Sequence, residues 1–434
     1  MSKESSRVTC AGKLTSELRA LRRCRILYLT FDGVLDPLGQ SQVVRYLCRL
    51  SDRGFSYSLI SLERESNLVN AKVLSETEEL LRRHAIEWIR LPYHIGGPKA
   101  VLRNIREMAR SARGLIRTRD IGLVHARAYV PAFIARYLQL RCGTSYLFDA
   151  RGYWIDEKAA EGQWFTRPGV YAGAKWLERR LFQSAVAIVT LTAVMADDLR
   201  TGILRNKQQI PIAVIPTCAD FDHFSPASRT PSAVPTELRL RLEGKLVVGM
   251  MGAINASYCV REGLVLFRML RERRADAHLL CVTQQVALAR ALIRGVGISE
   301  DDCTITQSSY QDMPDWMRWM DWGLLLLNET FAKRGSMPTK LAEMMACGVR
   351  PVQYGCNQEV ADRVHKAGSG IALTDLSLST LAQCAEQIAI TPLLSDVVRR
   401  ARDESCSWFG IESGINKYES LLTQILMSKD HLVH

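Results

Sequence analysis

The residues with the clearest chemical potential lie in one stretch, Lys333–Gly348, which reads KRGSMPTKLAEMMACG. An apolar run at Trp322–Leu327 comes just before it and is typical of a buried parallel strand. Ser336 and Pro338 then favour the start of a helix, with the serine as its cap and the proline in its first turn. The sequence therefore predicts a strand, a polar turn and a helix in succession.

Lys340 and Glu343 lie three residues apart near the start of that helix, so they share one of its faces. A cation at a helix N-terminus favours an anion, and a carboxylate beside it can accept hydrogen bonds from sugar hydroxyls. Together these groups suit a nucleotide diphosphate with its ribose. The alternative is an ordinary strand-to-helix turn with a solvated Lys–Glu pair.

Strands alternate with helices along the chain, which calls for mostly parallel sheets with helices on both faces. The predicted strands lie at 25–30, 57–62, 86–91, 121–125, 145–149, 186–191, 212–216, 246–251, 278–283, 303–306, 322–327 and around 352. A loop with Gly33 and Gly39 follows the first strand, but the full G-x-G-x-x-G pattern of dinucleotide-binding folds is absent.

The predicted fold class is α/β, with two Rossmann-like domains facing a central cleft that would hold the ligand. Residues 217–243 have the proline- and serine-rich composition of a linker. The predicted organisation is a basic tail (1–24), an N-terminal domain (25–218), a linker (219–244), a C-terminal domain (245–410) and a C-terminal helix (411–434) that crosses back to the first domain.

Composition narrows the function classes. The 434 residues carry a formal net charge of +12 and are 47% apolar and 24% charged, which is ordinary for a globular protein in water. No apolar run approaches the length of a membrane span, and the basic N-terminus lacks a secretory core, so we expect a cytoplasmic protein. The twelve cysteines form no C-x-x-C pair, which argues against a zinc site and against disulfides.

Positive charge is concentrated at 82–119, where ten Lys or Arg face two Glu. Such a segment indicates an anionic partner, either an acidic phospholipid surface or a phosphorylated substrate, or else is only a solvated face. No nucleic-acid motif accompanies it, so no nucleic-acid partner is expected. The sequence thus allows peripheral association with the inner face of an anionic membrane.

Four motifs together carry a family resemblance. The strongest is SMPTKLAEMMACG at 336–348, and the others are DPLG at 36–39, LVH at 123–125 and IPTCADFDHFSP at 215–226. The first is similar to the S-x-P-x-K-x-x-E-x-x-A-x-G signature of the retaining family 4 of GT-B fold glycosyltransferases (glycosyltransferase group 1). Over about residues 26–427 the chain resembles that family.

The resemblance implies roles for individual positions. Lys340 would neutralise the donor diphosphate as the glycosidic bond breaks, and Glu343 would bind the ribose hydroxyls. Glycine at two positions would let the backbone approach the donor without a β-carbon. The full set of implied donor-binding residues is Gly39, Gly252, Ser336, Pro338, Thr339, Lys340 and Glu343.

His125 ends an apolar strand, where its side chain could hydrogen-bond the donor sugar or polarise the acceptor. The alternative is a structural histidine with satisfied hydrogen bonds. The family usually places its sugar-contacting histidine here or two residues later, where this chain has Arg127. On this basis the implied catalytic residues are His125, Lys340 and Glu343.

A polar, aromatic loop follows the next strand and is the candidate acceptor site. Its charged residues are Asp149 and Arg151, and its rings, Tyr153 and Trp154, could stack on a sugar. The alternative is that Asp149 and Arg151 form an ion pair that holds the loop.

Some positions depart from the family pattern. Gly335 stands where the family often has a glutamate that contacts the sugar. The loop from Gly252 to Tyr258 lacks the Arg and Lys that grip the diphosphate in many members, so phosphate binding would rest on Lys340, helped by Lys333 or Arg334. These departures leave the identity of the sugar open.

The predicted function is a metal-independent, hexosyltransferase-like retaining enzyme. It would move a sugar from a nucleotide-diphosphate donor to a hydroxyl of a glycan or lipid-linked glycan, in cell-surface or exopolysaccharide biosynthesis. No metal or other cofactor is expected, because the only D-x-D triplet, Asp220–Asp222, lies in the predicted linker. The alternatives are a nucleotide-sugar 2-epimerase and a non-catalytic GT-B scaffold that binds nucleotide sugars.

Overall fold

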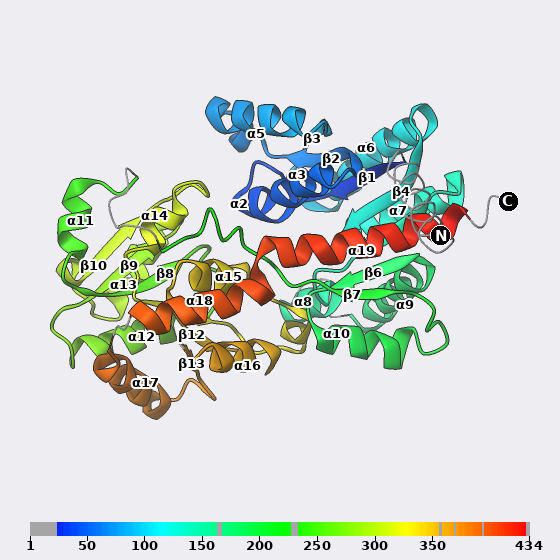
Figure 1. Ribbon diagram of the computed structural model, residues 1–434. Coiled ribbons are helices and arrows are strands. Elements are labelled where there is room, and N and C mark those ends of the chain that lie inside the picture. Colours follow the sequence, from blue (N-terminus) through cyan, green and yellow to red (C-terminus); the bar gives the residue numbers. More distant parts are fainter. Residues whose placement is uncertain are drawn as a thin grey trace, which may run out of the picture. The chain divides into compact units, whose positions relative to one another are not determined.

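The computed structural model describes residues 24–162, 167–226, 233–355, 358–368, 370–392 and 395–430 (Figure 1). Apart from its last residue, the predicted basic tail at 1–24 lies outside these residues. The chain divides into two compact units, which we call unit 1 and unit 2. In the described residues, unit 1 comprises 24–155, 167–215 and 414–430, and unit 2 comprises the remainder, with the short segment 156–162 included.

Unit 1 is built on a seven-stranded sheet within the described residues, with strand order β3-β2-β1-β4-β5-β6-β7. All of its strand pairs are parallel, and helices connect them. Its elements are β1 (Arg25–Thr30), α2 (Pro37–Gly39), η1 (Gln40–Val44), α3 (Arg45–Asp52), β2 (Ser56–Glu63), α4 (Glu65–Leu68), α5 (Ala71–Arg83), β3 (Glu87–Pro92), α6 (Gly97–Thr118), β4 (Ile121–Arg127), α7 (Tyr129–Cys142), β5 (Ser145–Asp149), α9 (Pro168–Ser184), β6 (Ala187–Thr190), α10 (Ala193–Asp198), η3 (Leu199–Ile203) and β7 (Ile212–Val214).

Unit 2 contains a second parallel sheet, of six strands in its described part, with strand order β10-β9-β8-β11-β12-β13. Its elements are α11 (Thr236–Leu242), β8 (Leu246–Met251), α12 (Val260–Arg271), β9 (Ala277–Val282), α13 (Val286–Gly295), η4 (Glu300–Asp302), β10 (Cys303–Thr306), α14 (Met313–Met317), β11 (Trp322–Leu326), η5 (Phe331–Gly335), α15 (Thr339–Ala346), β12 (Arg350–Tyr354), α16 (Gln358–Ala367), β13 (Ile371–Ala372), α17 (Leu378–Ile390) and α18 (Ser395–Phe409).

Two helices run from one unit into the other. α8 (Trp154–Ala160) begins in unit 1 and continues in unit 2, and α19 (Ile411–Asp430) begins in unit 2 and joins unit 1 from Gly414 onward. The described parts of the predicted linker, 219–226 and 233–244, belong to unit 2 and contain α11. None of the helices in the described stretches is both long enough and apolar enough to cross a membrane.

The cores follow from the two-residue period of the strands. In unit 2, alternate residues of the central strands face one side of the sheet, for example Leu246 and Val248 of β8 or Leu279 and Cys281 of β9. They pack against the apolar faces of α12 and α17 in one continuous cluster. The predicted α/β class with two parallel-sheet halves is therefore confirmed.

The strand orders fix where a ligand site can form. In unit 1 the chain builds outward from β1 to β3 and then returns to β4 on the other side of β1; in unit 2 it does the same around β8 and β11. The helices that follow such neighbouring strands lie on opposite faces, which leaves a crevice at the carboxyl ends of the strands. The candidate residues of both units lie at these two points.

Candidate functional site

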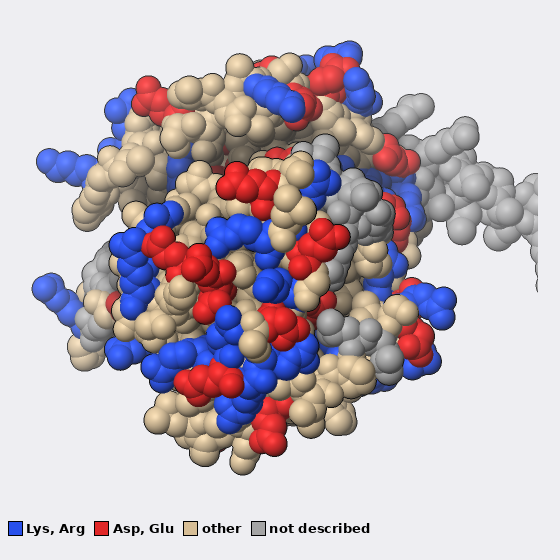
Figure 2. Space-filling model, turned by 90° about the vertical axis from the view of Figure 1, so that its left-hand side faces the viewer, with Lys and Arg blue, Asp and Glu red and all other residues tan. Residues whose placement is uncertain are grey.

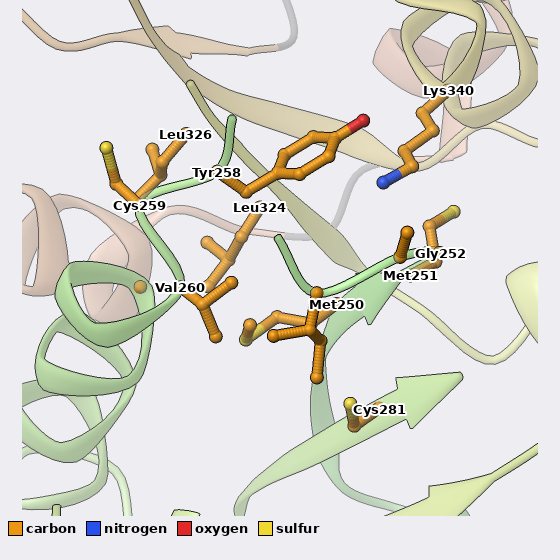
Figure 3. Close-up of a pocket in the computed structure, with 13 residues that line it drawn as sticks. Met250, Met251, Gly252, Tyr258, Cys259, Val260, Cys281, Leu324, Leu326 and Lys340 are labelled. Atoms are coloured by element: carbon orange, nitrogen blue, oxygen red, sulfur yellow. The ribbon is translucent and has the colours of Figure 1, made fainter. Parts of the chain in front are cut away.

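A pocket lies at the switch point of unit 2, where β8 and β11 end (Figure 3). Most of its wall is apolar, with a tyrosine and a lysine as its polar side chains. The lining residues are Met250, Met251, Gly252, Ala253, Ile254, Tyr258, Cys259, Val260, Gly263, Cys281, Leu324, Leu326 and Lys340. Three strands and two helices thus bring together residues that are up to 90 positions apart in the sequence.

The ammonium group of Lys340 is fixed inside this pocket. Its Nζ lies 3.9 Å from the ring centroid of Tyr258, a cation–π contact that Figure 3 shows from the side. Gly252 has a φ of +91°, and a β-carbon built there would lie 2.6 Å from Nζ. A glycine is therefore needed both for the backbone conformation and to leave room for the lysine.

The loop that carries Tyr258 is tied to the end of β11. The amide of Cys259 donates to the carbonyl of Leu326 (2.9 Å), and the amide of Asn328 donates to the carbonyl of Ser257 (3.0 Å). Tyr258 and Leu327 also form an isolated antiparallel bridge. These bonds hold the tyrosine ring in place, so Lys340 meets a preformed surface.

Glu343 lies on the same helix, but no ion pair within 4 Å joins it to Lys340 in the described structure. Burial raises the pKa of Glu343 to about 8, and the charge of Lys340 only partly opposes this shift. The carboxyl group is therefore largely protonated at neutral pH. This contradicts the simple alternative of a solvated Lys–Glu pair.

The turn before α15 differs from the prediction. Pro338 is the residue that caps α15, and no side chain provides the cap hydrogen bond. Ser336 follows the 3-10 turn η5, and its hydroxyl donates to the carbonyl of Ala332 (3.4 Å), so the prediction that Ser336 caps α15 is wrong. Thr339 is the first residue of α15. The hydroxyl of Thr217 donates to the carbonyl of Met337 (2.7 Å) and holds this turn.

The basic residues before the turn have other contacts. Lys333 forms an ion pair with Glu157 of α8 (3.0 Å) and is only 11% exposed, while the guanidinium of Arg334 stacks on Phe331. Neither residue lines the pocket, so their predicted help to Lys340 is not seen. Gly335 is buried and brings no side chain to the site.

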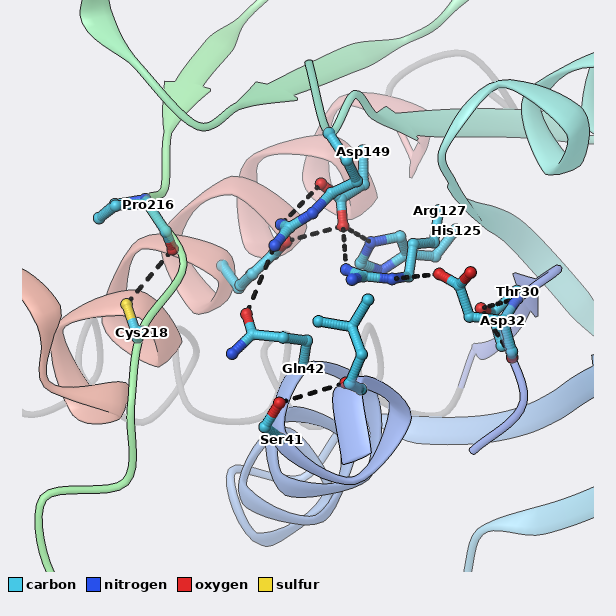
Figure 4. A network of polar contacts seen from close by, with 12 residues as sticks. Thr30, Asp32, Ser41, Gln42, His125, Arg127, Asp149, Pro216 and Cys218 are labelled. Carbon is cyan, nitrogen blue, oxygen red and sulfur yellow. Dashed lines mark hydrogen bonds and ion pairs between the residues drawn. The ribbon is translucent and has the colours of Figure 1, made fainter. Parts of the chain in front are cut away.

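At the switch point of unit 1 lies a buried polar cluster (Figure 4). Asp149, at the end of β5, is its centre and is 1% exposed. His125 and Arg127 approach its Oδ2 to 3.8 Å each, and Arg151 approaches its Oδ1 to 3.4 Å. Tyr418 of α19 donates its hydroxyl to Oδ2 at 3.1 Å.

Charge and burial set the protonation states in this cluster. Burial alone would raise the pKa of Asp149, but the guanidinium groups of Arg151 and Arg127 outweigh it and hold that pKa well below its usual range. Burial lowers the pKa of His125 and outweighs the attraction of Asp149, so the imidazole is neutral at neutral pH. Neither ring nitrogen of His125 has a hydrogen-bond partner among the described residues.

His125 lies beneath two aromatic rings, those of Tyr28 (centroids 4.5 Å apart) and Tyr418 (5.5 Å apart), and is 2% exposed. In this conformation its side chain does not reach solvent. Its predicted catalytic role would therefore require Tyr418 or the strand end to move. His125 and Arg127, the two positions at which the family places its histidine, both lie beside Asp149 in this structure.

The residues predicted to bind an acceptor mostly make structural contacts. Arg151 pairs with Asp149, which is the alternative that the sequence left open. The hydroxyl of Tyr153 donates to Asp198 (2.6 Å), and its ring is buried, so in this structure the ring is not exposed for stacking on a sugar. Trp154 is half-buried and stacks on Tyr129, with ring centroids 5.8 Å apart.

The packing of the loop after β1 requires a glycine at position 39. A β-carbon there would come within 2.1 Å of the Gly33 carbonyl oxygen, so the loop could not close with any other residue. The backbone amides of Val34 and Leu35 in this loop already donate to the buried carboxylate of Glu63 (2.8 and 3.3 Å). These amides are therefore occupied and do not offer a phosphate site.

No group of three or more His, Cys, Asp or Glu side chains in the described stretches could hold a metal ion. Asp220 of the D-x-D triplet accepts hydrogen bonds from the backbone amides of Asp222 and His223, which is a turn-stabilising role.

Sequence reasoning missed three residues of these sites. Tyr258 stands in a loop where only the lack of cations was noted, Tyr418 comes from a distant helix, and Glu63 ends a strand. An aromatic residue six positions after Gly252 was the signal available for Tyr258. For Tyr418 and Glu63 the sequence contains no local signal, because their partners lie far away along the chain.

Comparisons with known proteins agree with this architecture. Residues 39–218 match the family model of the glycosyl transferase 4-like domain. No curated protein matches the chain in sequence. A solved glycosyltransferase from Rickettsia africae is similar at 16% identity, with 93% of this chain and 99% of that chain covered and a TM-score of 0.64.

Two other solved structures are similar to the same extent. HepE from Anabaena, in complex with UDP and glucose, matches at 15% identity (92% of this chain and 100% of that chain, TM-score 0.64). WaaG, a glycosyltransferase involved in lipopolysaccharide biosynthesis, matches at 14% identity (90% and 98%, TM-score 0.62). At these identities the likeness shows the fold alone, and it confirms the predicted GT-B fold with two Rossmann-like domains.

Proposed function

We propose that this chain is a glycosyltransferase of the glycosyl transferase 4-like family, whose model matches residues 39–218, and that it uses a nucleotide-diphosphate sugar as donor. The acceptor would be a hydroxyl of a glycan or of a lipid-linked glycan in the biosynthesis of cell-surface or exported polysaccharide. The observation that carries the proposal is the Lys340 ammonium, held between Tyr258 and Gly252 in the pocket at the end of β8.

The donor half of the proposal follows from the charges in this pocket. The diphosphate would bind at Lys340 and at the start of α15, where the backbone amides and the helix dipole also favour an anion. Glu343 would bind the ribose hydroxyls, and its carboxyl group, protonated when the site is empty, can donate as well as accept a hydrogen bond.

The chemical step would place its new negative charge beside Lys340. The bond between the anomeric carbon and the diphosphate oxygen breaks, and the acceptor oxygen forms a bond to the same carbon. The proton of the acceptor hydroxyl passes to the departing phosphate oxygen. Because the pocket offers no nucleophilic carboxylate among its lining residues, we propose attack from the leaving-group face, which retains the anomeric configuration.

We further propose that Lys340 supplies the positive charge that a metal ion provides in other sugar transferases. HepE binds UDP and glucose, and in another structure UDP-glucose, which makes uridine diphosphate donors the first to try. The unit 1 cluster around Asp149 would shape the acceptor side through Arg151, the half-buried guanidinium of that set.

The experiment that tests the proposal is a donor panel. The protein is incubated with a series of nucleotide sugars and a mixed glycan acceptor, and the release of free nucleotide diphosphate is measured. Lys340→Met should abolish release, while Lys245→Met, an exposed lysine of unit 2 outside the pocket, should leave it unchanged. Release that needs a divalent metal would refute metal independence.

The same panel separates the alternatives. A changed sugar with the nucleotide still attached would indicate a 2-epimerase. Stabilisation of the fold by a nucleotide sugar without any turnover would indicate a binding scaffold. Gly335 leaves the sugar side of the site without the family's glutamate, and this is the feature that favours a non-catalytic scaffold.

A further inference from the structure

Helix α7 exposes an apolar stripe although its other face is part of the core. Phe133, Tyr137 and Leu140 follow one another at helical spacing on the outer face, with exposed fractions of 42%, 36% and 68%. The inner face, with Ile134 and Leu138, is fully buried against the sheet. The outward-facing side chains of Phe133, Tyr137 and Leu140 therefore have no role in the core of unit 1.

The neighbouring helix α9 continues this exposed surface. Trp176 is 61% exposed and Val170 is 39% exposed. The two helices are fixed side by side, because Gln139 of α7 donates to the carbonyl of Ser184 and Tyr129 donates to the carboxylate of Glu178. Exposed apolar side chains on two neighbouring helices indicate a contact surface rather than scattered exceptions.

The same side of unit 1 is strongly basic. The three helices α6, α7 and α9, which pack in that order, carry six, two and three Lys or Arg and only two Glu. Both carboxylates are engaged: Glu107 with Arg103 and His94, and Glu178 with Tyr129 and Lys175. Within these three helices no carboxylate is left to balance the cations.

Cations and rings are also interleaved on this surface. The guanidinium of Arg141 lies over Tyr137, 5.8 Å from the ring centroid, and that of Arg180 lies over Trp176 at 5.4 Å. The start of α6 adds an exposed aliphatic residue, Leu102. We call this surface the aromatic–basic face; its members are Leu102, Arg106, Arg110, Arg117, Phe133, Tyr137, Leu140, Arg141, Val170, Trp176, Arg179 and Arg180.

The end of unit 2 is different. Figure 2 shows the side formed by α11, β10 and α13, where basic and acidic side chains are interspersed. There Arg294 pairs with Glu300 and Arg271 pairs with Asp302. Charge of a single sign is therefore a feature of the α6, α7 and α9 side and not of the whole molecule.

We propose that the aromatic–basic face docks on an anionic phospholipid surface. Tryptophan and tyrosine rings bind at the lipid headgroup level, aliphatic side chains reach the acyl boundary, and arginines meet the lipid phosphates. A second copy of this chain does not fit, because two faces of this kind would bring like charges together. The proposal uses no residue of the donor pocket, so it can fail while the proposed function stands, and the reverse also holds.

The residues proposed to contact the lipid differ from those that the sequence indicated. The sequence indicated the basic segment at 82–119, but Arg82 and Arg83 pair with Glu79, Arg90 pairs with Glu78, and Arg119 pairs with Glu87. The cations of α6 remain, and the apolar anchors come from α7 and α9, outside that segment.

The test is co-sedimentation of the full chain with vesicles of phosphatidylcholine, with and without phosphatidylglycerol. We expect binding only when the anionic lipid is present, and weakening with salt. Phe133→Ser with Trp176→Ser should weaken binding about tenfold or more. Arg110→Glu and Arg179→Glu should each weaken it roughly 25-fold, because each reversal removes two unit charges of attraction.

Two variants of unit 2 serve as matched controls. Leu240→Ser removes an exposed apolar side chain and Arg290→Glu reverses an exposed arginine, and both should bind vesicles as the unmodified protein does. Thermal unfolding verifies that each variant is folded. Equal binding to uncharged vesicles, or unchanged binding in the Phe133/Trp176 variant, overturns the proposal.

Two further outcomes would also overturn it. A dimer in lipid-free solution that the Phe133/Trp176 variant loses would assign the face to a second copy of the chain. Binding to single-stranded oligonucleotide that displaces the vesicles and depends on the same rings would assign it to nucleic acid.

Discussion

The stacking of Lys340 on Tyr258 leads to a quantitative prediction about donor binding. The ammonium lies 3.9 Å from the ring centroid in a partly buried pocket, and a cation–π contact in such a place contributes about 1–2 kcal/mol. Its effect on the donor is indirect, because the ring fixes a lysine side chain that would otherwise sample many rotamers. Tyr258→Leu should therefore raise the Kd for a nucleotide diphosphate about 5- to 30-fold.

The assay is titration calorimetry with uridine diphosphate as the probe. Tyr258→Phe keeps the ring and should change the Kd by no more than about twofold, since Phe also offers a π face to the ammonium. Lys340→Met should cost more than Tyr258→Leu, because it removes the charge itself. Thermal unfolding of each variant shows whether a loss of affinity reflects a loss of fold.

A double-mutant cycle decides whether the two residues act together. If the ring acts through the lysine, Tyr258→Leu should change the Kd little once Lys340 is already methionine. An undiminished effect of Tyr258→Leu in that background would refute the reasoning. So would a Tyr258→Phe variant that binds as weakly as Tyr258→Leu, because the hydroxyl group would then contact the ligand directly.

Three further predictions concern other residues of the two sites. Burial raises the pKa of Glu343 from about 4.5 in the unfolded chain to about 8 in the folded protein. The protonated carboxyl group therefore contributes stability that is fully present below about pH 4.5 and is lost as the pH rises to about 8. The Tm of the unmodified protein should fall relative to that of Glu343→Gln across this range, and a constant difference would contradict the pKa shift. Gly252→Ala should lower stability by about 1–2 kcal/mol and also weaken uridine diphosphate binding, whereas Gly244→Ala, with a φ of +72° and open space for a methyl group, should lower stability alone. Tyr418→Phe removes one hydrogen bond to the buried carboxylate of Asp149 and should lower the urea unfolding free energy by about 1–3 kcal/mol; an unchanged value would mean that the carboxylate does not depend on the C-terminal helix.

Much of the fold could be predicted because the signals are local. The alternation of apolar strands with helices placed β1, β5, β8 and β10 at the residues where the structure has them. Parallel strands joined by helices allow few arrangements, so the α/β class followed from the pattern. The signature with Lys340 and Glu343 likewise identified the helix that lines the pocket.

The electrostatic state of these residues required the tertiary structure. Spacing placed Lys340 and Glu343 on one face of a helix but left a solvated Lys–Glu pair as the alternative, whereas in the structure burial keeps Glu343 protonated and Tyr258 holds the lysine. Desolvation depends on every neighbour of a group, and those neighbours come from several strands and helices. No short window of sequence contains that information.

The differences between the sequence-based expectations and the structure have the same physical cause. Tyr153 and Ser336 have residue types suited to a ligand, but each donates its hydroxyl to a protein acceptor nearby. Tyr418 reaches Asp149 from 269 positions away, because helix α19 packs with unit 1. The sequence by itself determined the fold class, the positions of several strands, and the residue types of the site. Only the tertiary structure decided which of those side chains remain available, because availability depends on contacts between elements that are far apart in the chain.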